Sequence, residues 1–465
     1  MPETILPATL PPQRMTKRNR WILLLWVAAA ISVVAMAITC PAGWDIAPCW
    51  TAIQSVSHGA SPYADGIADL KAYHDLPSHA AGDHPPKIFW YSPLTIPLLH
   101  MLALFPGWLL GTLFWCAMVA AFLLQLRAGY QMASERERRW LIFLLPFVAF
   151  FPGLVGDIAI VSGNVAYILY GLILLAAFPG WKRNQWSWFY IAVIFASIFK
   201  SPMLTLLAFP ILVGRRQWVA AGITGATGCL LFAIQPLLWP AQFKEFQSAA
   251  HLVFDWTRDF GFGPPGVIGE LLWKMHKPYS LATTVAYVVW AVGLGTLLLV
   301  TSRRVRRNPS LRELWIPVAF LCTILLNPRV KPYDNAALTV PMLLIAWRAL
   351  QMAQQQLVHR RANRARLLGS AQLHPVPVED RSVWAPLLAG SCVFIALNAF
   401  NNIPWSDGIS VELIFLLCIL SAGIWSLWSA EIASPGEPNS QPFFTKQAAS
   451  SRVSLTTGGE NGPSR

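Results

Sequence analysis

Asp45 is the residue of this sequence that is best placed to act as a general base. It follows the first long apolar run, residues 21–40, and begins the first long polar stretch, residues 41–93. A carboxylate at this position can accept a proton from a hydroxyl group that arrives from water or from a membrane surface. The competing interpretation is an ordinary solvated acid, because Asp65 and Asp69 lie in the same stretch.

Three cations lie where they could bind an anionic group. Lys200 separates two short apolar segments, and Arg329 and Lys331 follow an Asn-Pro pair. A lysine so close to a membrane either extends to water or meets a partner. Both types of cation can also bind phosphate through charge-assisted hydrogen bonds. For Arg329 and Lys331, capping the end of a membrane span is an equally open interpretation.

We expect no metal centre. Asp83 and His84 are adjacent, and two neighbouring ligands cannot enclose a metal ion. The seven cysteines lack metal-ligand spacing, and five lie in apolar runs, where a thiol behaves as a small hydrophobic group. Only Cys40 and Cys49 are placed to meet an oxidising compartment, and a disulfide between them remains open.

The composition predicts an all-α polytopic membrane protein. The chain of 465 residues is 55% hydrophobic and 12% charged, with 22 tryptophans, and apolar segments long enough to span a bilayer recur along it. The net charge of +13 does not indicate nucleic-acid binding, because the basic residues lie in short segments between apolar runs rather than on one face. Ionisable residues are nearly absent from the middle of the expected spans, which disfavours a pump.

About twelve transmembrane helices are expected, with both termini in the cytoplasm. Residues 94–106 are too short to cross and are expected to form a helix at the outer interface. The expected spans cover residues 21–40, 108–126, 140–156, 164–180, 186–200, 201–214, 217–238, 279–301, 313–327, 336–350, 384–402 and 409–429. This arrangement places about three quarters of the 35 lysines and arginines in cytoplasmic segments, as the positive-inside rule requires.

The domain organisation follows from these spans. Residues 1–20 form a cytoplasmic segment, residues 21–430 a single membrane domain, and residues 431–465 a disordered cytoplasmic tail rich in Ser, Pro, Gly and Thr. Within the membrane domain, residues 41–107 form the first outer loop with its interfacial helix, and residues 239–278 form the second outer loop. Gly and Pro residues in the second loop, at positions 260–266, predict a tight turn that could cover a site.

Several stretches of the chain form an ordered set: Asp45 with Gly59–Tyr63, Phe89–Leu94, Gly163–Asn164, Lys200–Pro202 with Arg215–Trp218, and Arg329–Pro341. This set resembles the GT-C superfamily of membrane glycosyltransferases, and within it the bacterial polyprenyl-phosphate-mannose-dependent α-mannosyltransferase family. In the late segment this chain has Tyr333 and Asp334 where that family often has a histidine.

The resemblance implies an enzyme of the cell membrane that transfers a hexose, expected to be mannose, from a polyprenyl-phosphate carrier to a hydroxyl of a lipid or glycan acceptor. Transfer would invert the anomeric carbon at the outer face, without a cofactor. Asp45 would be the catalytic base, and Lys200, Arg329 and Lys331 would bind the lipid phosphate. The other expected substrate-binding residues are Tyr63, Tyr91, Tyr333 and Asp334.

Two alternatives come from other classes of protein. A transporter or flippase of lipid-linked saccharides would also need cations and an aromatic cavity, but it should show related halves and function without Asp45, and the sequence shows no internal repeat. A noncatalytic membrane scaffold would tolerate substitution at every residue named above. The sequence does not identify the acceptor or the oligomeric state.

Overall fold

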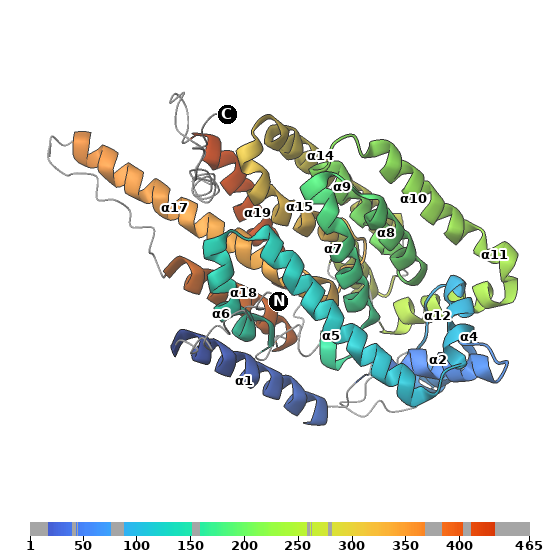
Figure 1. Ribbon diagram of the computed structural model, residues 1–465. Helices are drawn as coiled ribbons and strands as arrows, with labels where there is room; N and C mark the ends of the chain where they lie inside the picture. Colours follow the sequence, from blue (N-terminus) through green and yellow to red (C-terminus); the bar gives the residue numbers. More distant parts are fainter. Residues whose placement is uncertain are drawn as a thin grey trace, which may run out of the picture.

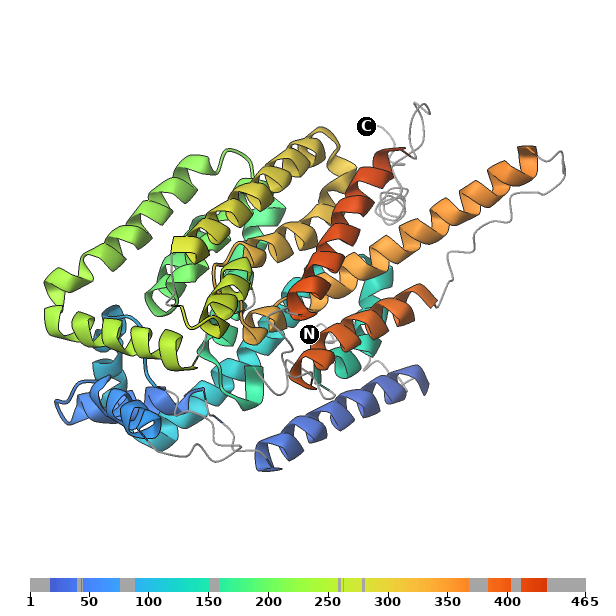
Figure 2. The same ribbon diagram turned by 180° about the vertical axis from the view of Figure 1, so that it is seen from behind.

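The structure is a computed structural model of the whole chain, and its described part is all-helical (Figures 1 and 2). It describes residues 17–39, 43, 45–75, 88–150, 159–257, 261, 263–277, 281–367, 384–402 and 411–432. No strand occurs in these ranges. The expected all-α class is therefore confirmed for the described residues.

Long helices form the main bundle. They are α1 (Lys17–Thr39), α5 (Gly107–Met132), α6 (Glu135–Phe150), α7 (Val165–Arg183), α8 (Ser187–Phe199), η3 with α9 (Ser201–Leu207 and Ala208–Val213), α10 (Trp218–Ala233), α14 (Leu281–Arg307), α15 (Arg312–Leu325), α17 (Thr339–Leu367), α18 (Trp384–Asn402) and α19 (Val411–Ile432). The short η4 (Pro309–Leu311) joins α14 to α15.

Shorter helices gather at one end of the bundle, which we call the loop end. They are α2 (Ala47–Ser57), α3 (Ala64–His74), η1 (Pro93–Thr95), α4 (Ile96–Ala103), α11 (Gln235–Leu238), α12 (Pro240–Thr257), α13 (Pro264–Lys274) and α16 (Pro332–Ala336). In both views α2, α4 and α12 lie together beside the first residues of α5.

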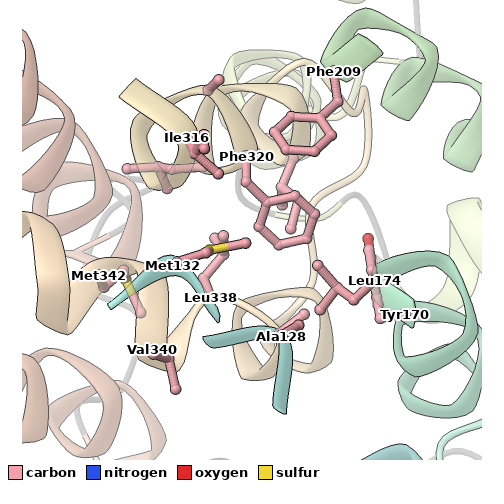
Figure 3. Close-up of a cluster of buried hydrophobic side chains, with 14 of the residues drawn as sticks. Ala128, Met132, Tyr170, Leu174, Phe209, Ile316, Phe320, Leu338, Val340 and Met342 are labelled. Carbon is pink, nitrogen blue, oxygen red and sulfur yellow. The ribbon is translucent and has the colours of Figure 1, made fainter. Parts of the chain in front are cut away.

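The main core lies where α5, α7, α15 and α17 meet. Side chains from these helices interdigitate with Phe209 of α9 (Figure 3). Every residue of α15 from Trp315 to Leu325 is buried. At Gly171 of α7, an added Cβ would lie 2.8 Å from the backbone of Ala121 in α5. Glycine therefore allows α5 and α7 to approach closely enough to share this core.

Five helices in the described ranges are long and apolar enough to cross a membrane. They are Gly107–Met132, Val165–Arg183, Trp218–Leu238, Leu281–Arg307 and Leu413–Ala430. Shorter apolar helices include Ser187–Phe199 and Ser201–Val213. Each of these would extend for only about 20 Å, less than the roughly 30 Å hydrocarbon core. The structure thus supports a multi-pass membrane protein, while the count of about twelve spans stays a prediction.

Large apolar side chains on the outside of the bundle agree with a lipid environment. On α14, Leu281, Val289 and Val292 are exposed by 77%, 67% and 62% of their surface. Exposed apolar residues also line α5 and α10. A water-soluble chain would not leave such continuous helix faces uncovered.

Arginines close the end of the bundle opposite the loop end, which we call the basic end. Arg312 donates to the carbonyl of Trp181 at 2.6 Å, and Arg306 donates to that of Ile211 at 2.6 Å. Both carbonyls belong to the last turns of helices, whose C-terminal carbonyls lack partners within the helix. Arg348 is held by Glu137 in a buried ion pair at 2.7 Å. These contacts hold the ends of α7 and α9 against α15 and α14, and join α6 to α17.

The loop end has a core of its own. Ile46, Tyr63, Phe89 and Leu99 are buried together with Ala249 and Val253 of α12. In α12, Phe246, Ala249 and Val253 recur at helical spacing and turn one apolar face toward this core. The sequence predicts short interfacial helices in the outer loop region, and within residues 239–278 the structure has α12 and α13. The apolar face of α12 has a packing partner that lies far away in the sequence.

Several expectations fall wholly or partly outside the described residues. These are the N-terminal segment up to residue 16, Cys40, the Asp83-His84 pair, and the tail from residue 433. Cys49 is described, and its thiol is buried and free.

Candidate active site

Asp45 is held against the segment that leads into α7. Its backbone N–H donates to the carbonyl of Ser162 at 2.9 Å, and the N–H of Gly43 donates to that of Val161 at 2.7 Å. The side-chain amide of Asn164 donates to Oδ2 of Asp45 at 3.0 Å. Both the backbone and the carboxylate of Asp45 are therefore fixed relative to α7.

The turn before α7 makes this contact possible. Asn164 is the N-cap of α7, and its Oδ1 accepts a hydrogen bond from the N–H of Ala166 at 3.0 Å. Gly163 has φ +71°, and a Cβ there would lie 3.0 Å from Ile46. Since a side chain would be both strained and crowded at Gly163, glycine lets the Asp45 segment lie directly on the start of α7.

The two tyrosines of the first outer loop differ in position. Tyr63 is fully buried, and its hydroxyl donates to the carbonyl of Tyr91 at 2.7 Å. The ring of Tyr91 packs edge-on against Phe199 at the end of α8, with centroids 6.1 Å apart. Tyr63 therefore supports the backbone of Tyr91, and its own contact with a substrate stays a prediction.

Electrostatics link Tyr91 and Tyr333 to residues that are distant in the sequence. Burial raises the pKa of Tyr91 well above its ordinary value; the charge of Asp45 raises it further, and Arg329 lowers it. Burial also raises the pKa of Tyr333, which Arg329 lowers and Asp45 raises. Both phenols thus lie within electrostatic range of Asp45 and Arg329.

Lys200 is paired with Asp334. Its Nζ lies 2.7 and 3.0 Å from the two carboxylate oxygens and 4.4 Å from the ring centroid of Tyr333. Asp334 is fully buried and also accepts hydrogen bonds from the hydroxyl of Tyr170 at 2.9 Å and the backbone N–H of Lys331 at 2.8 Å. Lys200 does meet a partner, as the sequence suggests. That partner is a carboxylate of the same chain, so the lysine charge is compensated within the protein.

Arg329 lies between aromatic rings. Its guanidinium carbon is 4.3 Å from the ring centroid of Trp90 and 5.6 Å from that of Phe254 in α12. The side chain is 9% exposed, and burial lowers the pKa of Arg329, while Tyr333 raises it. A guanidinium stays protonated in proteins, so Arg329 is a largely desolvated cation held by stacking.

The described part of the glycine-rich turn lies against Arg329. Gly261 has φ +81°, and a Cβ there would lie 2.7 Å from the carbonyl oxygen of Val330 and 3.1 Å from Cγ of Arg329. Gly263 lies beside the carbonyl of Pro328. Glycine at position 261 is therefore required by the close approach of the two segments. Gly261 and Gly263 thus lie against the backbone that carries Arg329, and a role of the turn in covering a site stays a prediction.

The helix α7 joins the two halves of this arrangement. Asn164 at its start holds Asp45, and Tyr170 binds Asp334. Six residues of helix separate Asn164 from Tyr170, which corresponds to about 9 Å along the axis. Asp45 and the segment that contains Asp334 thus both contact α7, Asp45 at the N-cap and Asp334 about 9 Å further along the helix.

A family match identifies the chemistry. The model of glycosyltransferase family 87 matches residues 89–328, just over half of the chain. The protein belongs to glycosyltransferase family 87. No curated protein and no solved structure matches the chain. The expectation of a membrane glycosyltransferase is confirmed, and the enzyme interpretation replaces the transporter and scaffold alternatives.

Glycosyl transfer requires a group that takes a proton from the acceptor and a group that stabilises the leaving oxygen. In this family 87 glycosyltransferase, the expected candidates among the described residues are the Asp45 carboxylate for the first task and the Arg329 guanidinium for the second, and both assignments stay predictions. Among the same residues, no group of three or more His, Cys, Asp or Glu side chains could hold a metal ion.

The expected site residues leave out four that contact them in the structure, although Asn164 and Trp90 lie in stretches that carry the family resemblance. Asn164 could have been suggested by its place before an apolar run, where an N-cap is expected. Tyr170 lies inside such a run, and nothing in the sequence distinguishes it from a core residue. Trp90 and Phe254 hold Arg329 across long sequence separations. Aromatic residues are so common in this chain that no single one stands out.

Proposed function

We propose that this family 87 enzyme transfers mannose from a polyprenyl-phosphate carrier to an acceptor hydroxyl at the outer face of the cell membrane, with inversion at the anomeric carbon. The observation that carries the proposal is that an anchored carboxylate, Asp45, and a desolvated cation, Arg329, occur at the same end of a membrane bundle. Tyr91 and Tyr333 lie within electrostatic range of both.

In the proposed reaction the acceptor hydroxyl gives its proton to Asp45 while its oxygen attacks the anomeric carbon of the donor sugar. The bond between that carbon and the phosphate oxygen breaks, and the lipid phosphate leaves with an increased negative charge. Attack from the side opposite the leaving group inverts the configuration. Arg329 stabilises the leaving phosphate, since a cation in a water-poor site acts strongly on charge that develops there.

The remaining expected site residues take supporting places in this scheme. Lys331 is half-buried beside Arg329 and serves as a second cation for the phosphate. Lys200, which the sequence suggested as a phosphate ligand, is bonded to Asp334, so we assign it to holding the segment that carries Arg329. Tyr91 and Tyr333, which both Asp45 and Arg329 influence electrostatically, are assigned to contacts with the substrates, and Tyr63 supports Tyr91.

The test is a transfer assay with the purified protein in lipid, using a polyprenyl-phospho-mannose donor. Asp45→Asn keeps the size of the side chain but removes the base, so the rate should fall about 100- to 10,000-fold with little change in donor affinity. Asp69→Asn is the matched control, because Asp69 is an exposed acid of α3. Asp65 is less suitable, since it accepts a hydrogen bond from Ser55 at 2.9 Å. A rate near that of the wild type for Asp45→Asn would exclude the proposed mechanism.

A further inference from the structure

We infer that Asn164 is a positioning residue for the transfer reaction, acting through Asp45. Its side-chain amide holds the carboxylate in one orientation for accepting a proton. This inference rests on the proposed function, because Asn164 has this task only if Asp45 is the base. It adds to that function a residue that does not itself touch the reacting atoms.

The hydrogen-bond network fixes which end of the Asn164 amide meets Asp45. The Oδ1 atom accepts a hydrogen bond from the backbone N–H of Ala166, which can only donate. The other end of the amide must then be the NH2 group, and this group lies 3.0 Å from Oδ2 of Asp45. Since Asn164 is only 7% exposed and bonded at both ends, its side chain cannot turn away.

The contact matters for the geometry of the proposed step. A general base acts only when it lies within hydrogen-bond reach of the proton that it accepts. Without the amide, Asp45 loses the contact that orients its carboxylate, and a small misplacement of a catalytic group can lower the rate about 100-fold. Because the proposed scheme binds the donor phosphate through other residues, kcat should fall without an equal loss of donor affinity.

The substitution Asn164→Ser separates the two roles of the residue. Serine is as good an N-cap as asparagine, so the start of α7 keeps its cap, but serine lacks the amide that reaches Asp45. Asn308→Ser is the matched control, because Asn308 is also an N-cap, with its Oδ1 accepting from Ser310, and it precedes η4 on the side of the basic end. Both variants would be measured as full-length protein in lipid, with the polyprenyl-phospho-mannose donor.

We expect kcat to fall about tenfold in Asn164→Ser, because the carboxylate loses its orienting contact. The dissociation constant of the donor should change less than about twofold, and Asn308→Ser should match the wild type. A kcat within about twofold of the wild type in Asn164→Ser overturns the inference, and so does an equal loss of kcat and donor affinity, because a merely structural role would weaken both. If Asp45→Asn loses activity while Asn164→Ser keeps its kcat, the inference about Asn164 fails and the proposed function stands. Activity near the wild-type rate in Asp45→Asn overturns both.

Discussion

Replacement of Lys200 by Met should destabilise the protein more than it weakens donor binding. The Lys200 ammonium bonds both oxygens of Asp334, at 2.7 and 3.0 Å, and the two side chains are 12% and 0% exposed. Breaking a buried ion pair by removal of one partner typically costs about 3–5 kcal/mol, because the other charge remains buried. Asp334 keeps two donors, from Tyr170 and Lys331, so we expect a loss near 3 kcal/mol, the lower end of that range.

The double variant Lys200→Met/Asp334→Asn distinguishes the two roles considered for the lysine. Replacing both members of a buried pair by neutral groups is often close to neutral for stability. If Lys200 only holds Asp334, the double variant should recover both stability and donor affinity. If Lys200 also binds the lipid phosphate, stability should return while donor binding stays weaker by about 1.5–3 kcal/mol, which is roughly 10- to 150-fold.

The assay is thermal and denaturant unfolding in lipid, followed by intrinsic tryptophan fluorescence, together with titration of the polyprenyl-phospho-sugar donor. Lys182→Met is the control, since Lys182 is an exposed lysine at the other end of α7. The reasoning fails if Lys200→Met unfolds at the same temperature and denaturant concentration as the wild type. In that case the Lys200–Asp334 pair contributes nothing to stability, and the hypothesis that Lys200 binds the lipid phosphate would again be preferred.

Three further outcomes are expected. Arg329→Lys should raise the donor KM severalfold, because lysine keeps the charge but loses the planar stacking on Trp90, a contact worth about 0.5–2 kcal/mol; an unchanged KM in steady-state assays would argue against the phosphate role. Gly261→Ala should lower both stability and donor affinity, since its Cβ would lie 2.7 Å from a backbone carbonyl oxygen at φ +81°, and unaltered unfolding and binding curves would contradict this. In a cysteine-free background, Ala68→Cys should react with an impermeant thiol reagent on intact cells and Glu135→Cys only after lysis, since both positions are exposed in the structure, and the reverse pattern would invert the topology.

Much of the fold could be predicted because it depends on local patterns. Apolar runs bounded by basic residues predict α5 and α14 to within about six residues at either end, and the polar Lys200 marks the turn between α8 and η3. The expected span 336–350 covers only the first part of α17, which continues through a polar, basic stretch to Leu367. The position of α12 was not predicted, because its stability comes from the second core, whose other members lie in residues 46–110. An amphipathic stretch of moderate polarity resembles a loop until the surface that it covers is known.

The site was less predictable, because its contacts join residues that are far apart in the chain. The sequence indicates Asp45 and Arg329 by their residue types and by their positions after apolar segments. It does not indicate that Asn164 lies 119 positions from its partner Asp45, or that Asp334 lies 134 positions from Lys200. Residue type tells what a side chain can do, but its partner decides whether the charge is available to a substrate.

The two residues proposed for chemistry lie on either side of the region that defines the family. Asp45 precedes residues 89–328 and Arg329 directly follows them, whereas Asn164, Tyr170 and the rest of α7 lie inside. The family region therefore contributes the rigid helix, and the flanking segments contribute the groups that are tied to it. The helix α7 contacts Asp45 through Asn164 and Asp334 through Tyr170. A tilt of α7 would therefore change the orientation of Asp45 and of the Asp334 segment together. Substitutions in the middle of α7, remote from either group, are then able to alter the rate of transfer without removing any atom that meets the substrates.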